Sequence, residues 1–231
     1  MSTSPLVSVI IPTCNYGKFI AATLDSVRAQ SYHPLETIVV DDGSTDHTAD
    51  VVRAYPEVRY FYQSNQGVSV ARNRAIAEAQ GEFIAFLDAD DVWQPNKLSI
   101  QIAYMLENPD VGITATKIKN FIEPGTQLPS WFQPEIGLED HKSPIPSTLV
   151  VRRTVFSQIG NFSPDYRASE DLEWLCRARD AQIPIITLPE TLILRRLHGA
   201  NLSWQAWRES VHRAIKILRA SLARKTQRLA D

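Results

Sequence analysis

The first hundred residues alternate between short apolar runs and segments with helical spacing. The apolar runs, which are rich in β-branched residues, predict strands at Val7–Pro12, Leu35–Val40, Val58–Tyr62 and Glu82–Leu87. The segments between these runs predict helices at Lys18–Gln30, after Ser44–Asp46 and at Val68–Gln80. Strands that are apolar almost throughout and that alternate with helices are typical of a parallel sheet buried on both faces. We therefore expect an α/β fold with a mainly parallel central sheet flanked by helices.

The pattern loosens after this region. It predicts a helix at Gln94–Glu107, strands at Val111–Thr116, Ser147–Arg152 and Thr191–Leu197, and another helix at Ser169–Asp180. Between Phe121 and Pro146 lie five prolines: Pro124, Pro129, Pro134, Pro144 and Pro146. A segment this rich in proline predicts a long loop or lid.

The C-terminal segment Trp204–Leu229 has the spacing of an amphipathic helix. Its apolar stripe consists of Trp207, Val211, Ile215, Leu218 and Leu222. Residues 204–231 carry seven Lys or Arg against two acidic residues, a balance of +5 that leaves −7 for the rest of the chain. Two interpretations stand: a helix packed on the domain with a solvated basic face, or a helix docked on an anionic membrane. We favour the first.

Composition narrows the class of protein. With 44% hydrophobic residues, the 231-residue chain can bury a substantial core. No apolar run approaches the roughly 18–20 residues of a spanning helix. Two distant cysteines, Cys14 and Cys176, predict a reducing, cytoplasmic compartment and exclude a zinc site of ordinary spacing. The net charge of −2 selects no partner, and we expect no nucleic-acid partner.

Acidic residues follow two of the predicted strands, where ligands bind in open α/β sheets. In the segment FLDADDVW, Asp88 and Asp90 point to the same side of an extended chain, so their charges repel unless a cation lies between them. A hard divalent ion such as Mg²⁺ or Mn²⁺ would suit these oxygen ligands. We interpret Asp91 as a cap of the helix that begins near Gln94. A lone D-x-D triplet remains a weak signal.

The second acidic cluster is Asp41-Asp42, in IVVDDGSTD. Gly43 permits a tight turn, and Ser44–Asp46 can cap the next helix. Neither role explains the paired carboxylates, which could accept hydrogen bonds from a base or a ribose.

Taken in order, VSVIIPTCN, IVVDDGSTD and NQGVSVARNRAIAEAQGEFIAFLDADD closely resemble glycosyltransferase family 2. The resemblance is dense over Val7–Leu98 and thinner over Ser147–Ser203. It implies the GT-A fold, in a domain over 1–203 with a nucleotide-sugar-binding half (1–100) and an acceptor and catalytic half (101–203). The basic helix 204–231 would follow this domain.

The resemblance also implies roles for the residues on the donor side. The nucleotide pocket would contain Pro12, Thr13 and Asn15, and Asp42 would hydrogen-bond the base. Arg72 would lie near the donor phosphates, Asp88 would contact ribose or sugar, and Asp90 would ligate the metal. Many relatives have Tyr where this chain has Cys14, and whether Tyr16 replaces that ring stays open.

Downstream, ASEDLEWL resembles the catalytic Glu-Asp motif of the family. Asp171 would be the general base, and Glu170 would be an acceptor or support residue. From the residues alone, Ser169 as a helix cap with acids in the first turn explains the same pattern. RRLHGANLS resembles another family segment, in which His198 would contact the metal or phosphates, helped by Arg195 or Arg196.

These roles predict an inverting transferase that uses Mg²⁺ or Mn²⁺. It would move a sugar from a nucleotide-sugar, which we interpret as a UDP-sugar, to a saccharide or lipid-linked saccharide in cell-envelope polysaccharide or glycolipid synthesis. Acceptor choice would lie in the proline-rich loop, where Trp131 could stack on a sugar.

Two alternative functions remain. One is a nucleotidyltransferase, although PTCNYGK is a poor match to the Gly-rich, basic phosphate loop of those enzymes. The other is a non-catalytic nucleotide-sugar sensor, which would not need Glu170-Asp171.

Overall fold

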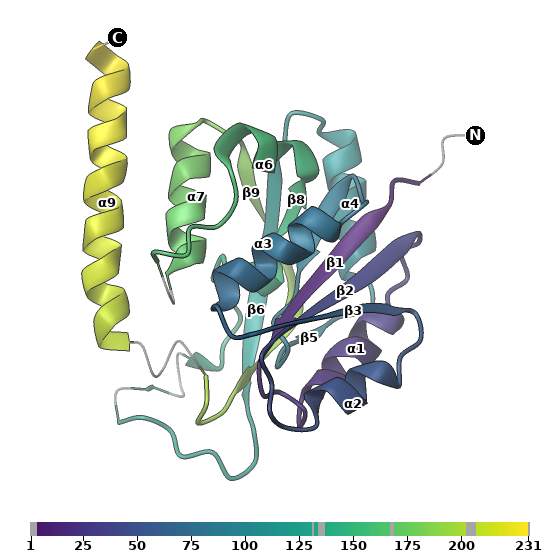
Figure 1. Cartoon of the computed structure of the whole chain (residues 1–231). Helices are drawn as coiled ribbons and strands as arrows, with labels where there is room; N and C mark the ends of the chain where they lie inside the picture. Colours follow the sequence, from purple (N-terminus) through teal and green to yellow (C-terminus); the bar gives the residue numbers. More distant parts are fainter. Residues whose placement is uncertain (1–3, 131, 134–136, 167–168, 202–206, 231) are drawn as a thin grey trace.

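The computed structural model describes residues 4–130, 132–133, 137–166, 169–201 and 207–230. Its strands are β1 (Val7–Thr13), β2 (Leu35–Asp42), β3 (Val58–Gln63), β4 (Phe83–Phe86), β5 (Val92–Trp93), β6 (Ile113–Ile122), β7 (His141–Lys142), β8 (Val150–Arg152) and β9 (Ile185–Leu197). They form one sheet in the order β3-β2-β1-β4-β8-β6-β9-β5 (Figure 1). β7 pairs with β6 off this path. Strands from both halves of the chain therefore share a single sheet.

The N-terminal strands are parallel, as predicted. β1 pairs with β2 and β4, and β2 pairs with β3. Thr13 lies opposite Asp41, and Asp42 lies opposite Gln63, so β2 extends two residues beyond its predicted end. The two aspartates thus belong to the last residues of a strand rather than to the loop after it.

The C-terminal strands are mixed in direction, unlike the parallel arrangement expected from the first hundred residues. β8 enters antiparallel between β4 and β6, and β9 runs parallel to β6 but antiparallel to β5. β9 begins six residues before the predicted Thr191. The register between β6 and β9 shifts between Ala115 and Lys117 of β6. This shift interrupts the alternation of side chains between the two faces of the sheet, so the first part of β9 lacks the period-two pattern of a strand.

Helices cover both faces of the sheet (Figure 1). They are α1 (Ile20–Arg28), α2 (Thr48–Arg53), α3 (Val68–Glu78), α4 (Lys97–Glu107), α6 (Arg153–Ile159), α7 (Glu170–Asp180) and α9 (Trp207–Ala230), with a short 3₁₀ helix η1 (Pro146–Thr148). Along β1, Ile10 packs into the core beneath α3 and α7, while Val9 and Ile11 pack into the core beneath α1 and α4. The apolar strands are therefore buried on both sides.

The proline-rich segment is largely irregular, as predicted, and its described part includes the short strand β7. Trp131 lies outside the described residues. Of the whole described region, no helix combines the length and apolar content that crossing a membrane requires.

The C-terminal helix packs on the domain, as in the favoured interpretation, but its predicted apolar stripe does not make the contact. α9 lies against α7 through Ile217, which is buried, and through Ser221 and Arg224, both of which bond to Asp180. The predicted apolar stripe faces outward at its described positions: Ile215, Leu218 and Leu222 are 48%, 53% and 64% exposed. The side chains of Trp207 and Val211 lie outside the described part. Buried Ile217 and the two polar side chains Ser221 and Arg224, rather than the predicted apolar stripe, hold α9 to the domain.

Candidate active site

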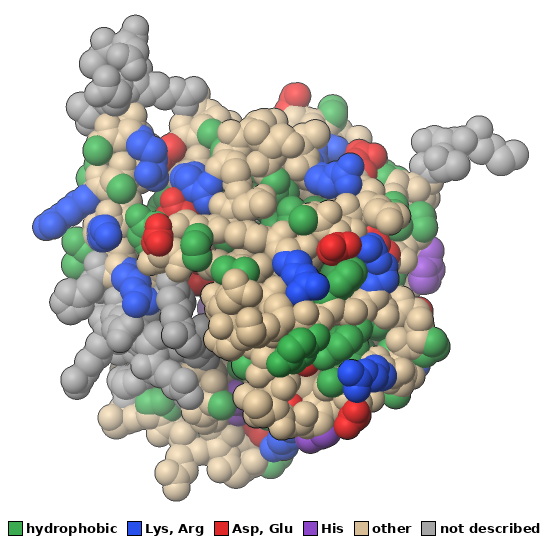
Figure 2. All heavy atoms as spheres, viewed as in Figure 1, with side chains coloured by type: hydrophobic (Ala, Val, Ile, Leu, Met, Phe, Trp, Pro, Cys, Tyr) green, Lys and Arg blue, Asp and Glu red, His purple; other side chains and the backbone are tan. Residues whose placement is uncertain are grey.

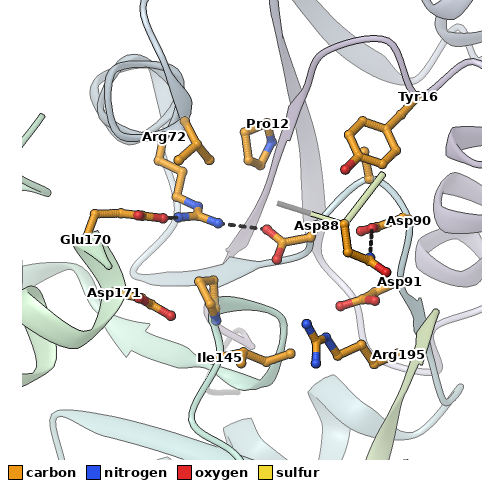
Figure 3. Close-up of a pocket in the computed structure, with 14 residues that line it drawn as sticks. Pro12, Tyr16, Arg72, Asp88, Asp90, Asp91, Ile145, Glu170, Asp171 and Arg195 are labelled. Carbon is orange, nitrogen blue, oxygen red and sulfur yellow. Dashed lines mark hydrogen bonds and ion pairs between the residues drawn. The ribbon is translucent and has the colours of Figure 1, made fainter. Parts of the chain in front are cut away.

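A pocket of about 180 Å³ opens at the carboxyl ends of β1 and β4, beside the first turn of α7 (Figure 3). It is lined by Pro12, Tyr16, Val68, Arg72, Asp88, Ala89, Asp90, Asp91, Ile145, Pro146, Glu170, Asp171, Arg195 and Asn201. Six of the ten residues assigned to the site from sequence line it: Pro12, Arg72, Asp88, Asp90, Glu170 and Asp171. Donor and catalytic motifs that are far apart in sequence thus meet in one cavity.

Arg72 connects the two sides of the pocket. It projects from α3 and is buried, with Nη2 donating to Asp88 Oδ1 at 2.8 Å and Nη1 donating to Glu170 Oε1 at 2.5 Å (Figure 3). Burial opposes its charge, but the carboxylates of Asp88 and Glu170 hold the pKa of Arg72 above its ordinary value. The arginine is therefore a permanent cation between two carboxylates.

Asp171 lies in the same first turn of α7 as Glu170 and points into the pocket (Figure 3). Burial and the neighbouring charge of Glu170 raise the pKa of Asp171 to about 6, while Arg72 opposes the rise. A carboxylate with a raised pKa is a stronger base than an ordinary aspartate and is still largely ionised at neutral pH. The helix-capping interpretation of this motif fails for Ser169, whose side chain makes no cap hydrogen bond.

Asp90 is held by two residues that follow β9. Its Oδ2 lies 2.9 Å from His198 Nε2 and accepts from Asn201 Nδ2 at 3.1 Å. Because His198 Nδ1 accepts the Ala200 N–H, the neutral imidazole carries its proton on Nε2 and donates it to Asp90. His198 is not among the residues that line the pocket, and the centre of its ring lies 4.6 Å from the centre of the Phe19 ring. In this tautomer His198 orients Asp90, and its predicted contact with a metal or with phosphates stays a prediction.

Asp91 is not a helix cap, because α4 begins only at Lys97 and its N-cap residue is Asn96. Its Oδ2 accepts from Ser147 Oγ at 2.7 Å, and its Oδ1 accepts from the Arg196 amide at 3.2 Å. The same Ser147 hydroxyl accepts the amide of Asp88. Asp91 therefore anchors the acidic loop to η1 and β9.

Negative charge collects along this loop. Burial, and then the charges of Asp90 and Asp88, raise the pKa of Asp91 well above its ordinary value, although Arg195 opposes them. Burial and the same two carboxylates also raise the pKa of Tyr16. Such crowding favours a bound cation.

The carboxylates of Asp88 and Asp90 fit a hard divalent ion whose other ligands include phosphate oxygens. No described residue donates a hydrogen bond to Asp88 Oδ2 or Asp90 Oδ1. Within the described ranges, no group of three or more His, Cys, Asp or Glu is arranged to hold a metal. Mg²⁺ is typically bound by one or two carboxylates together with substrate phosphates. The pair Asp88 and Asp90 supplies this number of carboxylates.

Asp42 is not among the residues that line the pocket. Its Oδ1 accepts from Gln63 Nε2 and the Gln66 amide at 2.8 and 2.9 Å, and its Oδ2 accepts from the Gly67 amide at 2.8 Å. These bonds hold the loop from which α3, and hence Arg72, begins. The contact of Asp42 with a nucleotide base stays a prediction.

Asn15 and Thr13 also lie outside the pocket lining. The Asn15 amide donates to Ser44 Oγ, and its side-chain oxygen accepts the Thr45 amide, so Asn15 ties the end of β1 to the loop after β2. Its φ of 59° is a conformation that Asn tolerates better than most residues. Thr13 is buried, and its hydroxyl has no partner in the described structure. The nucleotide contacts of both residues stay predictions.

Sequence reasoning did not identify several lining residues. Asn201 lies in the quoted segment RRLHGANLS, but its contact with Asp90 spans 111 residues. Ile145 and Pro146 close the pocket from the end of the proline-rich segment, and Val68 closes it from the start of α3. Only the position of Asn201, just after a strand, gave a usable signal.

The comparisons with known proteins agree with this architecture. The family model "Glycosyl transferase family 2" matches residues 8–168. A relative from Bacillus subtilis (strain 168), TuaG, named as a candidate glycosyltransferase of teichuronic acid biosynthesis, is 32% identical over 88% of this chain and 84% of its own length. The Escherichia coli protein WfgD, named a UDP-Glc:alpha-D-GlcNAc-diphosphoundecaprenol beta-1,3-glucosyltransferase, is 43% identical over 45% of this chain and 42% of its own length.

Solved structures show the fold. TarS 1-349 of S. aureus in complex with UDP-GlcNAc aligns with a TM-score of 0.76 and 24% identity over 94% of this chain and 66% of that one. The mannosyltransferase PcManGT of Pyrobaculum calidifontis, in complex with GDP-Man and Mn²⁺, aligns with a TM-score of 0.71 and 22% identity over 96% of this chain and 65% of that one. The GT-A fold implied by the sequence is confirmed. On the family match and its relatives, the chain belongs to glycosyl transferase family 2 and is an enzyme of glycosyl transfer.

Proposed function

We propose that the protein transfers a sugar from a UDP-sugar to a hydroxyl acceptor, with inversion at the anomeric carbon. The observation that carries the proposal is that Asp171 and the carboxylates of Asp88 and Asp90 line one pocket, linked through Glu170 and Arg72. One side of the pocket would stabilise the leaving diphosphate, and the other would activate the attacking hydroxyl.

The donor would enter with its reacting end first. The pocket volume of about 180 Å³ is below the roughly 300–1,000 Å³ typical of ligand sites, so it suits the sugar and phosphates better than a whole nucleotide-sugar. The nucleoside would extend past Pro12 towards Asn15 and Asp42. There Asp42 Oδ2, which takes one hydrogen bond, would accept a second from the base. The complexes of TarS with UDP-GlcNAc and PcManGT with GDP-Man support a nucleotide-sugar donor.

Asp88 and Asp90 would bind a divalent ion, Mn²⁺ or Mg²⁺, through Asp88 Oδ2 and Asp90 Oδ1, the oxygens that accept no hydrogen bond from a described residue. The Mn²⁺ in the PcManGT complex supports this assignment. Bound there, the ion would supply Lewis-acid stabilisation of the departing diphosphate. His198 and Asn201 would orient Asp90, and Arg72 would hold Asp88.

Asp171 would take the proton of the acceptor hydroxyl as its oxygen attacks the anomeric carbon. Its pKa of about 6 suits a base that works near neutral pH. Attack from the face opposite the leaving diphosphate gives inversion. Glu170, held by Arg72, would keep Asp171 beside the pocket.

The acceptor would be a saccharide or lipid-linked saccharide of cell-envelope polysaccharide synthesis. The names of TuaG and WfgD support this class, since the first refers to teichuronic acid and the second to a diphosphoundecaprenol-linked sugar. The segment Phe121–Pro146, which reaches the pocket at its end, would select the acceptor.

Donor binding and donor cleavage test the proposal separately. We expect thermal shifts with UDP-sugars that require Mn²⁺, smaller shifts with GDP-sugars, and release of UDP when an acceptor is added. Asp90→Asn should lose the metal-dependent shift, whereas Asp171→Asn should keep the shift and lose UDP release. Metal-independent binding without turnover on any acceptor would favour the sensor, and pyrophosphate release from a nucleoside triphosphate and a sugar phosphate would favour the nucleotidyltransferase.

A further inference from the structure

Helix α9 presents two different faces. The inner face consists of Ile217, Ser221 and Arg224, and it is held to α7 by two hydrogen bonds to Asp180. The outer face carries Ile215, Leu218 and Leu222, which are three of the five large apolar side chains that the described structure leaves exposed. Because these three recur at intervals of three and four residues, they form a continuous stripe.

Basic side chains border this stripe. Lys216 and Arg219 are both exposed, and the Lys216 ammonium lies 5.9 Å from the ring centre of Tyr166. The stretch 213–224 contains no Asp or Glu. Figure 2 shows basic and apolar side chains intermixed along the edge of the molecule that α9 forms.

Among the described side chains of α9, the charged ones beside this apolar stripe are Lys and Arg, a combination that matches one kind of surface. A helix that lies in the plane of an anionic bilayer buries its apolar stripe among the acyl chains and places Lys and Arg at the phosphates. A second copy docking through the same stripe would instead bring Lys216 and Arg219 of both chains together without an acidic partner, which is unfavourable.

We propose that the outer face of α9, formed by Ile215, Leu218 and Leu222 with Lys216 and Arg219, docks the protein on an anionic membrane surface. The docking is peripheral. α9 runs beside α7, whose first turn carries Glu170 and Asp171, so the docked helix keeps the pocket close to the lipid surface (Figure 1). This inference does not depend on the donor or on the role of any pocket residue.

Co-sedimentation of the whole chain with vesicles tests the docking. We expect binding to vesicles of phosphatidylcholine with 30% phosphatidylglycerol, weaker binding to pure phosphatidylcholine, and loss of binding as salt rises. Leu218→Ser with Leu222→Ser should lower the partition coefficient by at least about tenfold, since each leucine contributes through buried apolar area. Lys216→Glu with Arg219→Glu should lower it by more than about tenfold, at about fivefold per lost charge.

Matched substitutions elsewhere on the surface serve as controls. Leu106→Ser, at a leucine that is 52% exposed on α4, and Arg53→Glu, at an arginine whose side chain is 64% exposed on α2, should leave vesicle binding unchanged. Circular dichroism of each variant checks folding. Equal binding by wild type and both α9 variants, or no binding to anionic vesicles, would overturn the proposal. A wild-type dimer in light scattering that the leucine variant converts to a monomer would also overturn it, because a second copy would then cover the stripe.

Discussion

Arg72 and Glu170 form a buried ion pair, with Nη1 2.5 Å from Oε1, although 98 positions separate them in the sequence. Through the second nitrogen of the same guanidinium, Glu170 is joined to Asp88. The helix that carries the proposed base and the loop that carries the proposed metal ligands therefore share one cation. A substitution of Arg72 should therefore affect both the first turn of α7 and the loop that carries Asp88.

Arg72→Met should lower both stability and activity. It leaves Glu170 buried without its counter-charge, a type of loss that costs about 3–5 kcal/mol of unfolding free energy. Urea denaturation measures the loss. Arg74→Met on the same helix removes a hydrogen bond to the Tyr62 carbonyl and a cation-π contact with Phe61, and it should cost less than about 1 kcal/mol. Equal costs for the two variants would mean that the Arg72 pair is not a structural link.

Asp171→Asn should lower kcat by about 10²–10⁴-fold, because the amide cannot accept the acceptor proton. In the wild type, kcat/KM should rise with pH and level off above about 6, the pKa to which burial and Glu170 raise this carboxyl. The variant should lose this pH dependence. Asp165→Asn, in the exposed loop before α7, is the control and should keep normal rates. A fully active, folded Asp171→Asn variant would disprove the base assignment.

The same substitution should stabilise the fold at neutral pH. The native state raises the pKa of Asp171 from its ordinary value of 3.8 to about 6, so the contribution of this carboxyl to stability is lost as pH rises from 3.8 to about 6. Asn carries no such cost. In urea denaturation without divalent cations, the variant should gain on the order of 2 kcal/mol over the wild type at pH 8, with a smaller gain at pH 5. A gain independent of pH would contradict the raised pKa.

His198 offers a test between orienting Asp90 and ligating a metal. His198→Leu removes the donor to Asp90 Oδ2, so it should raise the Mn²⁺ concentration for half-maximal activity by about 10–100-fold. His198→Gln, whose amide can still donate, should retain much of the affinity. Phe19→Leu, which removes a ring packed on His198, controls for altered packing. Equal loss in the Leu and Gln variants would instead support direct ligation, as the family resemblance implied.

Local patterns in the chain account for most of the fold. Runs such as Val7–Pro12 are apolar on both sides, and this is the pattern of a strand covered on both faces. The mixed direction of β8 and β9 did not follow from sequence, because strand pairing depends on how distant segments meet rather than on periodicity. The shift in register between Ala115 and Lys117 hid the start of β9 for the same reason.

The sequence alone determined which residues are available for chemistry: carboxylates just after strands, the Glu-Asp pair at a helix start, and their order along the chain. Tertiary structure decided what they contact. Asp91, which was expected to cap a helix, instead anchors the acidic loop through Ser147. His198 and Asn201 both contact Asp90, and Leu218 of α9 faces outward. The physical reason is that spacing specifies which side of its own element a residue occupies, whereas hydrogen-bond partners and burial depend on the neighbours that packing brings from elsewhere in the chain.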